Sequence, residues 1–486
     1  MKLIKNYLYN AGYQLLVLLL PFITAPYIGR VLKPYGVGVN SYTNSIVQWF
    51  VLLAGVGISY YGNRQIAYVR SDRAKLSQTF WEIQLLKTLT TVIAFVLFFI
   101  FLRVYRQYTW YLWLQSLNVV AGVLDISWFY MGIEDFRSTV TRNTIVKLIT
   151  VVAIFIFVKT PNDIGTYIVL LAVGLILGNL SLWLKLPKYL DCINFKGLRP
   201  LIHLRPTIAM FIPQIATQIY LILNKNMLGI FSGPTAAGFY NQADTMIKMV
   251  LAIVTATGTV MLPHVANAFA RGEKEQVKRL LYSSFNFVSL LAVAMMFGMM
   301  AISRYLGLMF YGPGFGPVGQ AMAAESIVIL MIGWSNVIGM QYLLPVNRVK
   351  DFTWSVTLGA VVNIILNFPL IKLWGLMGAI WATVISETMV TGYQLYVVRH
   401  QLEFKQLFAD LGKYLLAGVV MFVLVYWLDQ LWQPKTLQLL PLLRLLGIIG
   451  LGVVLYGLVL LATRPRLLGD AINLLRNRHT NNQSEE

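Results

Sequence analysis

Among the ionisable side chains within or at the ends of long apolar runs of this sequence, where charge is rare, eight are the most informative. They are Arg30, Asp125, Lys147, Lys225, Asp244, Lys248, Glu325 and Glu387. A charged side chain at the centre of a lipid bilayer costs about 2.5–3.5 kcal/mol on insertion scales, so it persists only where it is paired or hydrated. These residues therefore predict a polar interior within a membrane protein.

The densest group of these charges lies in the middle of the chain. Asp244 and Lys248 are one helical turn apart and share a helix face, and Lys225 lies at a similar depth in the preceding helix. One interpretation is an ion cluster that holds the two helices together. The other is a cationic lining for a ligand, in which one acid balances two lysines.

The other embedded charges have structural and functional interpretations too. Asp125 and Lys147 lie at similar depths in successive helices and favour a structural ion pair. Arg30 closes the first apolar run, where a snorkelling interfacial arginine is the ordinary reading. Glu387, near the middle of its helix, is either a buried protonated carboxyl or an acid that couples transport to a cation. Glu325 is shallower and reads as interfacial.

The motifs of soluble-enzyme chemistry are weak or missing. GFGPVG at 314–319 fits the dinucleotide-binding pattern but contains a proline and follows no strand, so we expect a flexible loop there. The sequence has no GK[ST] phosphate loop. The four histidines lack metal-ligand spacing and are expected to be solvated, and the single cysteine, Cys192, excludes an internal disulfide. We therefore expect no enzyme activity, no metal and no cofactor.

Composition and periodicity indicate the elements that carry these charges. Only 12% of the 486 residues are charged and 58% are hydrophobic, whereas soluble domains carry about 25% charged residues. Apolar runs of about 20 residues, long enough to cross a bilayer as helices, recur along the chain. The predicted spans are 8–29, 39–61, 80–102, 108–131, 139–158, 164–184, 207–229, 238–263, 281–302, 319–345, 353–371, 376–398, 411–428 and 444–462. The predicted fold class is all-α, a polytopic integral membrane protein with about 14 transmembrane helices.

The basic residues indicate the orientation of these spans. If the N-terminus is cytoplasmic, inside segments hold 26 of the 39 Lys and Arg residues and outside loops hold 9. Cytoplasmic loops of membrane proteins carry the excess of positive charge. We therefore expect both termini in the cytoplasm of a cell-membrane protein, and we read the net charge of +20 as a topology signal rather than as nucleic-acid binding.

The longest inside connection, roughly 185–205, divides the spans into two groups of six with two left over. The expected domains are an N-terminal six-helix bundle at 1–190, a second six-helix bundle at 191–400, and two further helices with a basic cytoplasmic tail at 401–486. A faint repeat agrees with this division, because GVGVNSYTN at 36–44 and AAGFYNQAD at 236–244 each place a glycine before a polar helix start. Repeated halves are one architecture that transporters use.

Several motifs along the chain resemble one family of membrane proteins. They are PYIGRVLKPYGVG (26–38), GISYYGNRQIA (57–67), DISWFYMGIEDF (125–136), PQIATQIYLILNKNMLG (213–229), TVMLPHVANAFARGE (259–273), YGPGF (311–315) and IGWSNVIGMQYLLP (332–345). Their order and spacing resemble the polysaccharide transporters, or Wzx-type flippases, of the multidrug/oligosaccharidyl-lipid/polysaccharide exporter superfamily.

The resemblance implies two six-helix bundles facing a central cavity, and a substrate. That substrate is an undecaprenyl-diphosphate-linked oligosaccharide repeat unit, carried from the inner to the outer leaflet by alternating access for capsule, exopolysaccharide or O-antigen assembly. In the related lipid II flippases an arginine in the helix-one motif faces the cavity, and Arg30 occupies the corresponding place. The family often has an aspartate before the basic residue of helix seven, whereas this chain has Asn224 before Lys225.

The candidate substrate-binding residues are therefore Arg30, Lys225, Asp244 and Lys248, and Glu387 is the candidate coupling acid. Expected partners are the lipid-diphosphate-linked oligosaccharide, membrane lipids, and a polysaccharide polymerase with assembly proteins. The main alternative is a multidrug or cation antiporter of the same superfamily, which would favour acidic cavity residues. A membrane glycosyltransferase or polymerase is a third reading, but the predicted outer loops are too short for a large acceptor domain.

Overall fold

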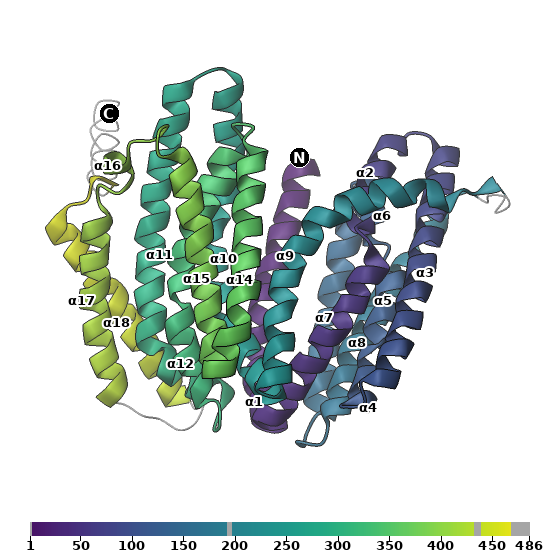
Figure 1. Cartoon of the computed structure of the whole chain (residues 1–486), viewed down its shortest axis with the longest axis horizontal. Coiled ribbons are helices and arrows are strands. Elements are labelled where there is room, and N and C mark those ends of the chain that lie inside the picture. The colour runs from purple at the N-terminus through teal and green to yellow at the C-terminus, as the bar shows by residue number, and fades with distance from the viewer. Residues whose placement is uncertain (1, 192–196, 432–438, 468–486) are drawn as a thin grey trace, which may run out of the picture. The chain divides into compact units, whose positions relative to one another are not determined.

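The computed structural model describes residues 2–191, 197–431 and 439–467, and all of its regular elements are helices (Figure 1). Cys192, His479 and the basic tail beyond residue 467 lie outside the described residues. By its internal contacts the chain divides into two compact units, Met1–Gly238 and Phe239–Glu486. The contact boundary lies after the seventh predicted span, and the division into domains at 1–190, 191–400 and 401–486 stays a prediction.

The first unit contains the helices α1 to α9. Their bounds are α1 Lys2–Gly55, α2 Ile58–Val69, α3 Arg73–Val104, α4 Thr109–Gln115, α5 Leu117–Leu124, α6 Ser127–Gly132, α7 Phe136–Phe157, α8 Ile164–Trp183, η1 Leu186–Lys188, η3 Pro200–His203 and α9 Leu204–Phe231. The second unit contains nearly all of α10 and the helices that follow. Their bounds are α10 Pro234–Ala270, α11 Lys274–Tyr311, α12 Gly316–Glu325, α13 Ile327–Ser335, η4 Asn336–Leu343, α14 Val349–Trp374, α15 Leu376–Val398, α16 Phe404–Leu407, α17 Leu411–Leu431 and α18 Leu439–Thr463.

The long helix α1 is two helices joined at a sharp break. Lys33 has φ 60° and ψ 173°, a backbone conformation that interrupts the helix just before Pro34, whose ring disfavours helical geometry in the preceding residue. The break separates the first two predicted spans, 8–29 and 39–61. Each of the fourteen predicted spans falls mostly on helix, but ten helices in the described residues meet the length and hydropathy expected of a membrane crossing. The all-α, multi-pass fold is therefore confirmed, whereas the count of fourteen stays a prediction.

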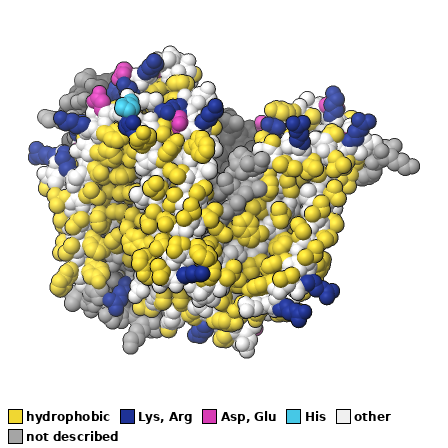
Figure 2. Space-filling model, in the orientation of Figure 1, with side chains coloured by type: hydrophobic (Ala, Val, Ile, Leu, Met, Phe, Trp, Pro, Cys, Tyr) yellow, Lys and Arg dark blue, Asp and Glu magenta, His cyan; other side chains and the backbone are white. Residues whose placement is uncertain are grey.

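Apolar side chains cover most of the helix faces that are visible in Figure 2. On α3 the side chains of Val92 and Ile100 are more than half exposed, and on α18 Val453 is 67% exposed. A soluble protein rarely exposes apolar surface on this scale, whereas a bilayer solvates it. These faces therefore identify lipid-contacting surface on helices of both units.

An aromatic core fixes the end of α5 in the first unit. Phe80 on α3 stacks on Trp128 of α6 with ring centroids 5.5 Å apart, and the Tyr130 hydroxyl donates to the carbonyl oxygen of Leu182 at 2.7 Å. Phe80, Trp128 and Tyr130 are almost fully buried. Aromatic side chains contribute large buried areas and geometric specificity, so this core holds the α5–α6 junction at Asp125 against α3 and α8.

The two glycines of the predicted repeat meet in the first unit. A Cβ built on Gly238 would lie 2.6 Å from Gly38 Cα, and one on Gly38 would lie 2.4 Å from the carbonyl oxygen of Pro234. Side chains cannot be accommodated at such distances, so both positions need glycine for the close approach of two backbones. The repeat detected in the sequence thus marks a point where α1 and the start of α10 cross closely.

Candidate functional site

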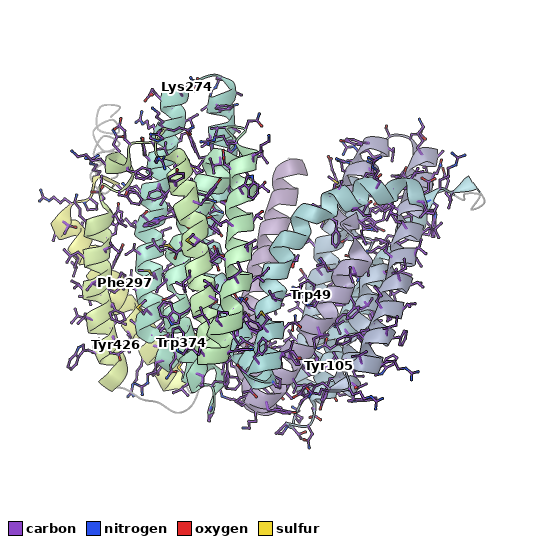
Figure 3. All side chains as sticks on the ribbon, viewed as in Figure 1. Trp49, Tyr105, Lys274, Phe297, Trp374 and Tyr426 are labelled. Carbon is purple, nitrogen blue, oxygen red and sulfur yellow. The ribbon has the colours of Figure 1, made fainter. Side chains whose placement is uncertain are left out.

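A cavity of about 230 Å³ lies within the first unit, between α1, α3, α5 and α9. Its lining combines charged, amide and apolar groups. The lining residues are Gln48, Val51, Leu52, Ala54, Gly55, Gly57, Ser59, Lys87, Gly122, Asp125, Phe211, Gln218 and Ile222. Trp49, labelled in Figure 3, marks the stretch of α1 that contributes to this lining. The lining is mainly apolar and carries a few polar groups, which is the usual composition of a small-molecule site.

One wall of the cavity is formed by a break in the backbone between α1 and α2. Val56 has φ 37° and Gly57 has φ 74°. Both values lie in the left-handed region, which residues other than glycine rarely adopt. A Cβ on Gly57 would also lie 3.1 Å from Phe211 Cα on α9. Strained backbone of this kind is often found at functional sites, and here it turns the chain so that Gly55, Gly57 and Ser59 all line the cavity.

Lys87 supplies the buried positive charge of the cavity. Its side chain is only 4% exposed, and Nζ donates to the main-chain carbonyl oxygen of Asp125 at 2.6 Å. The Asp125 carboxylate accepts from the main-chain N–H of Ser127 at 2.9 Å. The lysine that contacts Asp125 is therefore Lys87 on α3, whereas the sequence had suggested Lys147. An embedded ammonium of this kind marks a functional site by default.

The amides of the cavity are available for a ligand. Within the described part of the chain, neither the Gln48 nor the Gln218 side chain has a hydrogen-bond partner. Both side chains are half-buried, so water or a bound molecule can satisfy their polar atoms. Gly55 and Gly122 border the same space, because a Cβ on Gly55 would meet nothing within 4 Å and one on Gly122 would meet only Val51, at 3.9 Å.

Two of the predicted substrate-binding residues, Arg30 and Lys225, lie in the first unit outside this cavity lining. Arg30 is half-buried on α1 and its Nη1 donates to the carbonyl oxygen of Pro26 at 2.8 Å. Lys225 is half-buried on α9 between two buried asparagines, Asn224 and Asn226. Both are therefore half-buried cations on long helices, as a role in binding an anion requires.

The other predicted residues lie in the second unit. Lys248 Nζ is 2.7 Å from Asp244 Oδ2 on α10, with side-chain exposures of 46% and 12% respectively. The expected pairing of these two residues on one helix face is thus present. Glu387 is half-buried on α15.

One histidine departs from the expectation that all are solvated. His203 is buried, with its Nδ1 2.7 Å from the Tyr61 hydroxyl and its Nε2 2.9 Å from Glu82 Oε2. The Glu82 carboxylate also accepts from the main-chain N–H of Arg199 at 3.0 Å. Buried polar groups need partners, and this network provides them while it ties α2, α3 and the turn before α9 together. His264 and His400 are exposed as expected.

The long helices with exposed apolar faces define a polytopic integral membrane protein. Residues 3–269 match a family described as "Polysaccharide biosynthesis protein". The chain belongs to this family, which confirms the resemblance inferred from its motifs. A "Putative O-antigen transporter" of Shigella dysenteriae is 23% identical over 387 residues, covering 78% of this chain and 96% of that protein. Its Escherichia coli counterpart is also 23% identical, over 82% of this chain and 96% of its own length.

Solved structures show the same fold. A structure titled "Lipid II flippase MurJ, inward closed conformation" superposes with a TM-score of 0.76 at 14% identity, covering 93% of this chain and 98% of that chain. An inward-facing multidrug resistance MATE family transporter of the MOP superfamily gives a TM-score of 0.58 at 11% identity and covers 78% of this chain. The chain therefore has the helical fold of these two solved structures.

Proposed function

We propose that this protein is a flippase that moves a diphosphate-linked lipid oligosaccharide from the inner to the outer leaflet for surface polysaccharide assembly. The observation that carries this proposal is the set of cations on long helices, Arg30, Lys225 and Lys248, in a chain of the polysaccharide biosynthesis family. Relatives named as O-antigen transporters support the substrate class.

Moving a diphosphate-linked lipid across the membrane requires cations within the protein. The diphosphate of such a lipid carries negative charge that cannot cross about 30 Å of hydrocarbon unaided. Arginine and lysine side chains replace the hydration that the phosphate oxygens lose, through charge-assisted hydrogen bonds. The lipid tail stays in the bilayer while the headgroup passes through the protein. Alternating exposure of the headgroup site to the two sides of the membrane completes the transport cycle.

Within this proposal Arg30, Lys225 and Lys248 bind the diphosphate, and Asp244 positions Lys248 through their 2.7 Å ion pair. Glu387 is the acid through which a cation would be coupled to transport. The resemblance also predicts partners that use the delivered oligosaccharide, namely a polymerase and assembly proteins.

Deleting the protein from its host distinguishes the flippase from a multidrug antiporter of the same fold. We expect a deletion strain to lose its surface polysaccharide, to accumulate lipid-linked repeat units in the inner leaflet, and to keep normal tolerance of cationic drugs. Both traits are scored side by side in one strain, with the wild-type gene returned as the control. Intact polysaccharide together with heightened drug sensitivity would reject the flippase and favour the antiporter.

We further propose that the protein resides in the cytoplasmic membrane with both termini inside, because of the asymmetry in Lys and Arg between alternate loops. In a Cys192→Ser background, a cysteine at Asn162 should react with an impermeant thiol reagent in whole cells. A cysteine at Gln276 should react only after the cells are opened. Both native side chains are exposed, so access depends on the side of the membrane. The reverse labelling would overturn the orientation.

A further inference from the structure

We propose that the cavity of the first unit is a binding subsite for one sugar residue of the lipid-linked glycan, separate from the cations that hold its diphosphate. This inference rests on the proposed function and adds a carbohydrate site to it. The subsite would be formed by Gln48, Lys87, Asp125 and Gln218, which come from α1, α3, the end of α5 and α9.

The mixture of hydrogen-bonding groups favours a sugar over a phosphate. The Lys87 ammonium can only donate and the Asp125 carboxylate can only accept, whereas the Gln48 and Gln218 amides do both. Sugar hydroxyls also donate and accept, so they can satisfy every member of this set. A phosphate oxygen only accepts, and the Asp125 carboxylate lining the same cavity would repel its negative charge.

The size of the cavity limits the ligand to one ring. Its volume of about 230 Å³ lies below the roughly 300–1,000 Å³ of pockets that hold drug-sized molecules. The apolar surface of Val51, Leu52 and Phe211 suits the C–H faces of a sugar ring, while the polar groups meet its hydroxyls. The absence of side chains at Gly55 and Gly122 keeps this space open.

The charged groups are held in place before a ligand arrives. Lys87 Nζ is fixed by the 2.6 Å bond to the main chain of Asp125, and the Asp125 carboxylate is fixed by the 2.9 Å bond from Ser127. The Gln84 side chain, one turn before Lys87, donates to the carbonyl oxygen of Val123 at 2.9 Å and ties α3 to α5. Such preorganisation lowers the entropy that binding must overcome. The two glutamines, which lack protein partners within the described residues, supply adaptable contacts.

The decisive experiment measures the affinity of the purified full-length protein in nanodiscs for two kinds of lipid. One probe is undecaprenyl diphosphate without sugar, and the other is a panel of the same lipid carrying a single hexose, N-acetylhexosamine or hexuronic acid. For the wild type we expect at least one sugar-bearing lipid to bind roughly tenfold more tightly than the bare lipid, the gain of two or three net hydrogen bonds.

A side chain that fills the cavity should remove the extra affinity for the sugar-bearing lipid and leave the affinity for the bare lipid unchanged. Gly122→Leu places a side chain in the open space of α5, and leucine is a better helix former than glycine, so folding is preserved. We expect the affinity ratio of the two lipids to fall to about one, while the affinity for the bare lipid stays unchanged. The matched control is Gly450→Leu on α18, where a Cβ also meets nothing within 4 Å and where the ratio should stay at the wild-type value.

Gln48→Leu and Gln218→Leu provide a second test that leaves the volume nearly unchanged. Each should lower the affinity ratio by roughly threefold through the loss of a hydrogen bond to the sugar. The sugar assignment is overturned if Gly122→Leu keeps the wild-type ratio, if it weakens both lipids equally, or if no sugar improves binding to the wild type. If neither kind of lipid binds the wild type, the proposed function itself fails, and the subsite with it.

Discussion

Replacing Lys248 by glutamine should reduce lipid export by roughly 10–150-fold, the loss expected for one charge-assisted hydrogen bond of about 1.5–3 kcal/mol. The structure makes this variant informative, because the Lys248 side chain is 46% exposed and its partner Asp244 only 12%. A glutamine amide can still donate to the Asp244 carboxylate, so the protein should insert and accumulate normally. Export is measured as surface polysaccharide per amount of inserted protein.

The double variant Asp244→Asn with Lys248→Gln separates the two interpretations of this ion pair. If the pair only holds helix α10 in shape, the neutral pair should restore export, since no carboxylate is left without its cation. If Lys248 binds the diphosphate, the double variant should stay as inactive as Lys248→Gln. Lys274→Glu is a control for charge change alone, because Lys274 lies exposed at the start of α11 (Figure 3), where a helix N-terminus favours an acid. A fall in protein abundance that matches the fall in export would contradict the binding role.

Much of the helical framework follows from the sequence. Runs of about 20 apolar residues demand helices in a bilayer, because every backbone polar group must be paired within the segment. The break at Lys33 was also accessible, since Pro34 follows it in the gap between two predicted spans. The repeated glycines at 38 and 238 were visible as a pattern, but their mutual contact depends on how α1 and α10 cross, which the sequence does not specify.

Local irregularities inside predicted spans were less accessible. The span 108–131 is divided into α4, α5 and α6 at Ser116 and at Asp125. The Ser116 hydroxyl donates to the carbonyl oxygen of Trp113 at 2.7 Å, and such side-chain bonds compete with the helix. The span 319–345 ends in a π-helical stretch, η4, where the Gln341 amide donates to Asn336 Oδ1 at 3.2 Å. Hydropathy alone reports length and polarity, so it does not detect these changes of helix type.

The residues of the candidate site also differ in how far the sequence predicts them. Charges in apolar runs stand out in the sequence, and this pattern predicted Arg30, Lys225, Lys248 and Glu387. Lys87 also lies within the predicted span 80–102, but its acceptor is the main-chain oxygen of Asp125 rather than a side chain. A contact with a main-chain acceptor cannot be predicted from residue type, because every residue has a main-chain oxygen. The cavity itself depends on a left-handed backbone at Val56 and Gly57, and only the packed structure shows it.

Translocation of a labelled lipid by the purified protein tests the central claim most directly. The full-length chain is placed in liposomes that contain a fluorescent undecaprenyl-diphosphate-linked oligosaccharide, and an impermeant quencher added outside reports the label that reaches the outer leaflet. We expect the wild type to move the lipid at least tenfold faster than protein-free liposomes, since the spontaneous movement of a diphosphate through hydrocarbon is strongly disfavoured. Arg30→Glu should abolish this movement, because it replaces a phosphate-binding cation with a repelling anion, whereas Arg30→Lys should retain part of it. Wild-type protein that moves the lipid no faster than empty liposomes, while the same preparation transports an organic cation, would contradict the account.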